Sequence, residues 1–172
     1  IMVDASRDSA SAFSELRIPI IGSGMGIPAV QRLTLTAAGR YDHYSDFGDT
    51  FNPQFSLEWS PLSSLLVRAS YGTSYRAPTL YSVHQPRVVM PAQTRDPARN
   101  NEIVLFDAIA GGNPNLKPEE SDSRSIGLTW STRSLGNLRV ELDYWRITQE
   151  QRLQSISGVV ILANEHLFPG RV

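Results

Sequence analysis

The sequence contains no cysteine in its 172 residues. This absence excludes disulfide bonds, thiolate metal sites and cysteine nucleophiles within the chain. Long apolar runs are also missing, because none approaches the roughly 18 residues that a membrane-spanning helix needs. The formal net charge is only -1, which gives no reason to expect nucleic acid as a partner. What remains is a chain long enough for one ordinary domain.

The two ends lack the features of a complete secreted protein. The opening residues, IMVDASRDSASAF, contain neither the basic segment nor the apolar segment of a secretory signal. The final residues, NEHLFPGRV, hold no capping or turn signal. We therefore expect the chain to be a piece of something longer.

Alternation of apolar and polar residues is the dominant pattern, and segments with a helical period are scarce. It predicts an all-β fold of six antiparallel strands. Short turns, at 22–28, 45–49, 60–64 and 132–137, join most of them. A short helix is expected near 161–168. The predicted strands are 12–21, 30–44, 50–60, 64–76, 121–131 and 137–149.

One connection is much longer than the others. Residues 77–118 are rich in proline, asparagine, arginine and glycine, and we expect them to form an irregular loop. A loop of this length inside a compact domain is usually functional or disordered. Its basic and aromatic side chains suit an anionic chelate or a sugar, so the candidate ligand-binding residues are Tyr81, Arg87, Arg95, Arg99 and Phe106.

The predicted strands separate charge from apolar surface. The charges share one face: Arg40, Asp42, Glu58, Arg68, Arg76, Arg139, Glu141 and Asp143. The other face is aliphatic, with aromatic residues near both strand ends: Trp59 and Trp130 at the short turns, and Tyr41, Phe51, Tyr71, Tyr75 and Tyr144 at the long loop. Two aromatic belts around an aliphatic band are typical of a membrane β-barrel, whose polar residues line a wet interior. A soluble β-sandwich with packed apolar faces is the alternative.

Signals for enzyme chemistry are weak. The segment GSGMG at 22–26 lacks the following Lys-Ser/Thr of a phosphate-binding loop and is better explained as a turn. His43 lies near Asp42, Asp46 and Asp49, but their spacing is not that of a calcium loop. We therefore predict no catalytic residue, no metal, no cofactor and no enzymatic activity.

Four segments together carry a resemblance to a known family. They are GRYDHYSDFGDTFNPQFSLEWSP, LLVRASYGTSYRAPTLYSV, GGNPNLKPEESDSRSIGLTW and LRVELDYWRITQEQRLQSI, in that order. They resemble the C-terminal half of the barrel of TonB-dependent receptors, over roughly residues 12–156. One departure is Tyr75 in YRAP, where the family has phenylalanine.

The resemblance implies a fold and a function. The family forms a barrel of about 22 strands, closed by an N-terminal plug, in the outer membrane of Gram-negative bacteria. It imports scarce ligands such as ferric siderophores, cobalamin, haem or glycans, using energy from the TonB complex. Residues 1–172 would then be about six strands of the barrel, with 77–118 as a long extracellular loop and neither the plug nor the TonB-contacting segment in the chain. Outer-membrane lipid would surround it.

Two other functions stay open from the residues alone. A passive outer-membrane channel has the same physical features without a plug, and a soluble β-sandwich could bind a ligand such as a glycan. An isolated barrel piece would also expose unpaired edges at 12–21 and 137–149, so we expect it to aggregate without detergent.

Overall fold

The computed structural model describes residues 4–22, 24–25, 27–134 and 136–170. The chain divides into two compact units. The first comprises Arg7–Ala77 and Pro118–Gln151, and the second comprises Ile1–Ser6, Pro78–Lys117 and Arg152–Val172. Each unit is described by itself.

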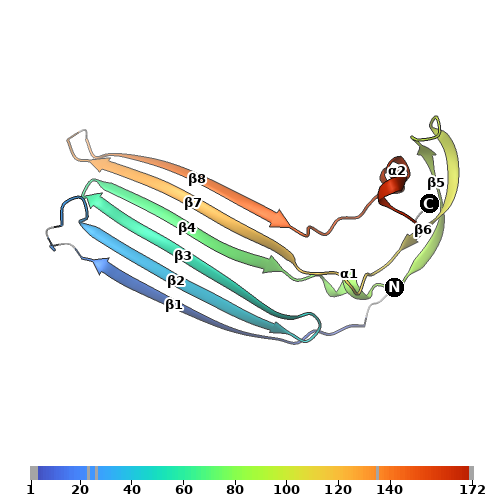
Figure 1. Cartoon of the computed structure of the whole chain (residues 1–172), viewed down its shortest axis with the longest axis horizontal. Coiled ribbons are helices and arrows are strands. Elements are labelled where there is room, and N and C mark those ends of the chain that lie inside the picture. The colour runs from blue at the N-terminus through green and yellow to red at the C-terminus, as the bar shows by residue number, and fades with distance from the viewer. Residues whose placement is uncertain (1–3, 23, 26, 135, 171–172) are drawn as a thin grey trace. The chain divides into compact units, whose positions relative to one another are not determined.

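The first unit is a single antiparallel sheet of six strands (Figure 1). Their order in the sheet is β1-β2-β3-β4-β7-β8, so each strand pairs with its neighbour among these six, and β1 and β8 are the edges. All six strands predicted from the alternation are therefore confirmed, with each end within about three residues of its predicted position. Their bounds are β1 Ser9–Ile21, β2 Arg32–Tyr44, β3 Gly48–Leu62, β4 Leu65–Arg76, β7 Glu119–Thr132 and β8 Leu138–Glu150.

The turns of the sheet fall as the sequence predicts. The β1–β2, β3–β4 and β7–β8 connections lie at one end of the strands, and the short β2–β3 turn lies at the other (Figure 1). Ser23 and Gly26, in the expected turn at 22–28, and Leu135, in the turn at 132–137, lie outside the described residues.

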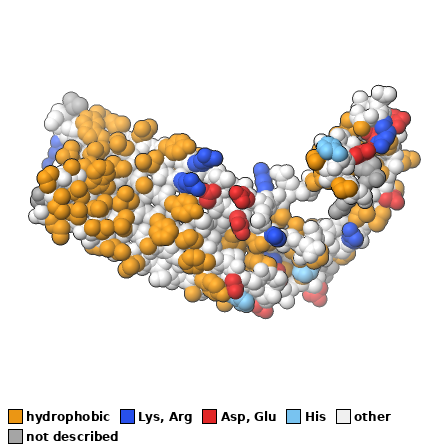
Figure 2. Space-filling model, viewed as in Figure 1, with side chains coloured by type: hydrophobic (Ala, Val, Ile, Leu, Met, Phe, Trp, Pro, Cys, Tyr) orange, Lys and Arg blue, Asp and Glu red, His pale blue; other side chains and the backbone are white. Residues whose placement is uncertain are grey.

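The sheet has no apolar core. Among the described residues, the side chains that are buried are polar, apart from Pro78 and Gly127, while aliphatic and aromatic side chains are half-exposed or exposed. The register puts Leu33, Leu35, Leu57, Val67 and Leu128 on one face. Figure 2 shows apolar side chains gathered over this face, nearest the short turns. A soluble sandwich would cover such a face with a second sheet, and the described residues of the first unit form a single sheet.

The second unit corrects the expectation that 77–118 is irregular. It contains a short helix, α1 (Leu80–His84), and a two-stranded hairpin of β5 (Val88–Asp96) and β6 (Glu102–Ala110). The hairpin was missed because Pro91 lies inside β5 and a proline is rare within paired strands. Asn100 and Asn101 take left-handed φ values of 52° and 58° in its turn, a conformation that asparagine tolerates well.

The end of the chain is helical but in two short pieces. We expected one helix near 161–168, and the structure has α2 (Gly158–Ala163) followed by a single 3-10 turn, η1 (Glu165–Leu167). No helix in the described part of the chain is long and apolar enough to cross a membrane.

Candidate functional site

The polar face of the sheet is built around a buried carboxylate. The side chain of Asp42 is fully buried, and it accepts hydrogen bonds from Nε of Arg40 at 2.9 and 3.0 Å and from Oγ of Ser11 at 2.6 Å. A buried charge is tolerated only when paired and hydrogen-bonded. Arg40 and Asp42 are two residues apart on β2, so both point to the same face.

The other predicted charges form pairs along the same face. Arg139 donates to Glu141 at 2.5 Å, and Arg68 donates to Asp143 at 3.2 Å. Arg76 lies 3.6 Å from Glu119. Glu58 has a partner that sequence reasoning did not assign to it, because Arg17 reaches it from β1 at 3.0 Å. The structure thus brings all eight predicted charges to one face and pairs each of them.

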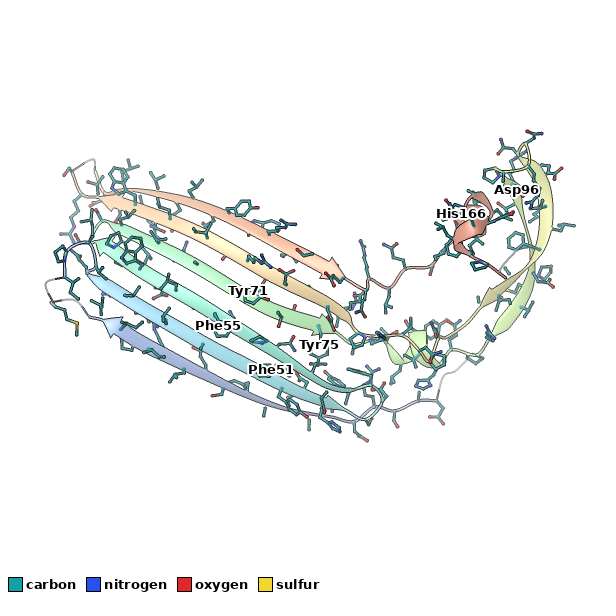
Figure 3. All side chains as sticks on the ribbon, in the orientation of Figure 1. Phe51, Phe55, Tyr71, Tyr75, Asp96 and His166 are labelled. Carbon is teal, nitrogen blue, oxygen red and sulfur yellow. The ribbon has the colours of Figure 1, made fainter. Side chains whose placement is uncertain are left out.

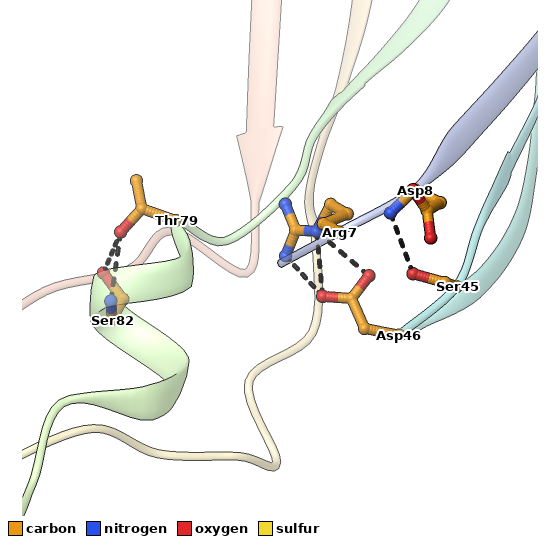
Figure 4. Close-up of polar contacts among 6 residues, drawn as sticks. All are labelled: Arg7, Asp8, Ser45, Asp46, Thr79 and Ser82. Carbon is orange, nitrogen blue, oxygen red and sulfur yellow. Dashed lines mark hydrogen bonds and ion pairs between the residues drawn. The ribbon is translucent and has the colours of Figure 1, made fainter. Parts of the chain in front are cut away.

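An aromatic cluster at the β2–β3 turn was not predicted. The rings of Tyr44 and Phe47 stack with centroids 4.5 Å apart, and the hydroxyl of Tyr75 donates to that of Tyr44 at 2.5 Å. Arg7 holds the turn by donating three hydrogen bonds to Asp46, at 2.6, 2.8 and 3.0 Å (Figure 4). The cluster closes the turn with stacking and charge-assisted hydrogen bonds.

Tyr75 corrects the prediction that it belongs to the apolar face. The pairing of β3 with β4 ends at Gln54 and Gly72, so an opening begins between the two strands. Tyr75 lies at this opening rather than on the sheet surface with Phe55 (Figure 3). Hydroxyl, amide and carboxylate groups line the resulting groove, which can therefore hold polar ligands by hydrogen bonds. Its lining includes Thr50, Asn52, Thr73, Ser74, Tyr75 and Glu120.

The acidic residues near His43 do not converge. His43 Nδ1 lies 2.6 Å from Asp49, while Asp46 is held by Arg7 and Asp42 by Arg40. Within the described ranges, no group of three or more His, Asp or Glu side chains has the geometry of a metal site.

The candidate ligand residues of 77–118 fall into two groups. Tyr81 on α1 is exposed, as is Arg87, for which the described residues provide no hydrogen-bond or ionic partner. Thr79 caps α1 by accepting from the backbone N–H of Ser82 at 3.1 Å (Figure 4). Arg95 is exposed but donates to the carbonyl of Asn101 at 3.2 Å.

Arg99 and Phe106 instead hold the second unit together. Arg99 bridges the fully buried Asp96 and Glu165, with its Nη1 2.7 Å from Glu165. Hydrogen bonds to Glu165 and then to Asp96 raise the pKa of Arg99. Burial by itself raises the pKa of Asp96, but hydrogen bonds from Arg99 and the N–H of Ala98 outweigh it and lower that pKa.

Phe106 packs where α2 begins. A Cβ built on Gly158 would lie 2.9 Å from the Phe106 ring, so only glycine allows this close approach. Two of the five candidate residues therefore join the hairpin to residues 158–167.

A twisted antiparallel sheet with one exposed apolar face and one charge-paired polar face defines part of a transmembrane β-barrel. The sequence from residue 2 to residue 168 matches the family described as TonB dependent receptor-like, beta-barrel. The chain belongs to this family, and its place is the outer membrane of a Gram-negative bacterium.

Relatives agree with this assignment. The chain is 31% identical over 104 residues to the iron-regulated outer membrane virulence protein of Vibrio cholerae serotype O1. This alignment covers 60% of the chain and 14% of that protein. It is 26% identical over 108 residues to the vitamin B12 transporter BtuB of the same species, covering 59% of the chain and 14% of BtuB. The chain thus spans about one seventh of the curated relatives it matches.

Solved structures show the same fold. The siderophore receptor PirA from Acinetobacter baumannii superposes with a TM-score of 0.65 at 18% identity, over 83% of this chain and 18% of PirA. The ferric enterobactin receptor PfeA from Pseudomonas aeruginosa gives 0.63 at 23% identity, over 84% of this chain and 18% of PfeA.

Proposed function

We propose that this chain is part of an outer-membrane active-transport receptor that takes up a scarce ligand with energy supplied by the TonB complex. The observation that carries the proposal is the family match across residues 2–168. The two faces of the sheet support it, because an exposed apolar face suits lipid and a charge-paired polar face suits a wet lumen. Enzymatic activity is no part of the proposal, and the family is one of receptors and transporters.

The lumen of this receptor is lined by the paired charges of the polar face. Their role is structural, or they dock the plug that fills such a barrel. Three pairs support this role: Arg40–Asp42, Arg68–Asp143 and Arg139–Glu141. Each arginine is already neutralised within the sheet and is therefore a poor candidate for catalysis.

Residues 77–118 form a long extracellular loop in this proposal. Loops carried by a rigid scaffold supply most binding residues in proteins. Among the candidate residues of this loop, Tyr81, Arg87 and Arg95 are exposed and make no hydrogen bond or ion pair with residues 158–167, and they suit an anionic ligand. A ferric siderophore is the first ligand class to test, since PirA and PfeA are siderophore receptors and a relative is iron-regulated. Cobalamin is the second, from the BtuB relative, with haem and glycans after them.

A TonB-independent passive channel is the competing function. Both would have this sheet, but only the receptor needs inner-membrane energy. The discriminating experiment deletes the gene that encodes the complete protein and measures uptake of radiolabelled ferric enterobactin and cyanocobalamin. Complementation with the complete gene is then compared in cells with and without TonB.

We expect complementation to restore uptake of one ligand only where TonB is present. Restoration without TonB would support the channel instead. If neither of these ligands is taken up, haem and glycans are measured in the same way, and failure to restore uptake of all four would contradict the receptor proposal.

A further inference from the structure

Two tyrosine hydroxyls meet on the polar side of the sheet, at the long-loop end. Tyr44 is the last residue of β2 and, because side chains alternate along a strand, it shares a face with Arg40 and Asp42. Tyr75, which is labelled in Figure 3, comes from β4, and β3 lies between these two strands. Tyr75 reaches Tyr44 where the pairing of β3 with β4 has ended, and its hydroxyl donates to the Tyr44 hydroxyl at 2.5 Å.

Further oxygen groups surround this tyrosine pair. The Tyr75 hydroxyl interacts with the Asp42 carboxylate and with the Thr50 hydroxyl. Tyr44 and Tyr75 are half-buried, and both line a groove of about 400 Å³ together with Asn52, whose amide carbonyl adds another oxygen. The groove is wide enough for an ion to reach the two hydroxyls.

The spacing of the two hydroxyls suits ligands of a single metal ion. At metal–oxygen distances of about 2.0 Å, neighbouring ligands of an octahedral ion lie about 2.8 Å apart. The Tyr44 and Tyr75 oxygens, which are 2.5 Å apart, need to separate by only about 0.3 Å. Tyr44 donates no hydrogen bond to any residue that the structure describes, so its proton can leave without breaking a contact within the protein.

We propose that Tyr44, Tyr75 and Asp42 form a binding site for a ferric ion, through two phenolate oxygens and one carboxylate oxygen. Tyrosine is known to hold iron in proteins. Zinc instead favours nitrogen and sulfur ligands, and calcium and magnesium take carboxylates, carbonyls and water. A phenol, with a usual pKa of about 10, loses its proton at neutral pH only beside a strongly polarising cation.

The charge of the site matches that of the ion. Each tyrosine releases its proton to solvent when iron binds, so two phenolates and the Asp42 carboxylate together carry three negative charges. Because binding displaces protons, it should tighten as the pH rises. Arg40 donates to Asp42 at 2.9 and 3.0 Å and fixes the direction of the carboxylate, as the hydrogen-bond partners of metal ligands commonly do.

This site goes beyond the proposed uptake of a ligand, because it holds the ion without a chelator and needs no energy from TonB. Tyr75 stands where the family resemblance leads us to expect phenylalanine, so the second hydroxyl distinguishes this chain. The described ranges contain no metal site made of His, Asp and Glu alone, and two of the three ligands here are tyrosines. Absence of iron binding would leave the transport proposal standing.

Tyr44→Phe and Tyr75→Phe are the sharpest tests, because each removes one oxygen ligand and keeps the ring. The complete receptor is purified in detergent and mixed with ferric nitrilotriacetate, in which iron and chelator carry different radioisotopes. Gel filtration measures how much of each stays with the protein, and the visible absorption band of phenolate-bound iron reports coordination by tyrosine. Tyr71→Phe is the matched control, since Tyr71 lies on the same strand and shares the outward face with Phe55. The shift in gel mobility on heating verifies that each barrel is folded.

We expect the unchanged protein and Tyr71→Phe to retain iron without the chelator and to show the band, more strongly as the pH rises. Tyr44→Phe and Tyr75→Phe should each weaken iron binding by about tenfold or more. Equal bands in Tyr75→Phe and Tyr71→Phe would overturn the proposal, as would a lack of iron binding by the unchanged protein. Retention of iron and nitrilotriacetate in equal amounts would also overturn it, because the site would then take the chelate.

Discussion

Arg68 on β4 reaches over β7 to Asp143 on β8, with Nη2 3.2 Å from Oδ1. The residue beneath this contact is Gly127, which is buried, and a Cβ built on it would lie 2.1 Å from the Asp143 oxygen. The ion pair therefore joins β4 to β8 across the strand between them, β7. It can do so because Gly127 has no side chain to block the contact.

Gly127→Ala is expected to push Asp143 aside and break this ion pair. Both partners are about half-exposed, at 43% and 53%, so the free energy of unfolding should fall by no more than about 1 kcal/mol. Urea unfolding of the complete barrel in lipid bilayers measures this cost. In an Arg68→Gln background the ion pair is already gone, and the cost of Gly127→Ala should shrink. An equal cost in both backgrounds would show that the alanine acts through a steric clash alone.

Acid is expected to release residues 158–167 from the hairpin. The lowered pKa of Asp96 means that its ionised form stabilises the folded arrangement with Arg99. This contribution is present above the usual aspartate pKa of about 4 and is lost as the pH falls through the lower folded-state value. Hydrogen exchange of α2, followed by mass spectrometry as the pH is reduced below about 4, measures the release.

Asp96→Asn should expose α2 to exchange already at neutral pH. Asp107→Asn is the control, because Asp107 is exposed on β6 and has no described partner. If α2 is as protected from hydrogen exchange in Asp96→Asn as in the unchanged chain, the Asp96 carboxylate does not hold residues 158–167 to the hairpin.

Substitutions in the long loop should separate ligand contact from loop architecture. Arg87→Gln and Tyr81→Ala remove exposed side chains, so we expect the half-saturation concentration for uptake to rise about threefold to tenfold with the maximal rate unchanged. Arg99→Gln should instead increase hydrogen exchange in α2, because Arg99 bridges Asp96 and Glu165. Normal uptake by Arg87→Gln and Tyr81→Ala would remove both from the ligand site.

The purified 172-residue chain is expected to aggregate in plain buffer. Its sheet exposes an apolar face and two unpaired edges, β1 and β8, and such edges pair with other chains. Light scattering should show large particles without detergent and a narrow size distribution with it. A monomer in plain buffer would contradict this expectation, because it would mean that the apolar face and the two edges are not exposed in solution.

The sequence predicted the strands well because lipid on one side and polar groups on the other impose a strict alternation. Arg40 and Asp42 were placed together for the same reason, since they are two residues apart. The pairing of Arg17 with Glu58 was out of reach, because it depends on how β1 and β3 lie on either side of β2. Tyr75 was misplaced because its position depends on where β3 and β4 separate, and the β5–β6 hairpin was hidden by Pro91.

The most direct test of the account asks which face of the sheet meets lipid. Leu35 and Thr36 are neighbours on β2 that point to opposite faces. The chain has no cysteine, so Leu35→Cys and Thr36→Cys in a complete barrel without other cysteines each give one spin-label site. In bilayers, the label at position 35 should collide mainly with oxygen, which dissolves in lipid, and the label at 36 with a water-soluble nickel complex. The opposite result, or equal access of the nickel complex to both positions, would contradict a lipid-facing apolar surface.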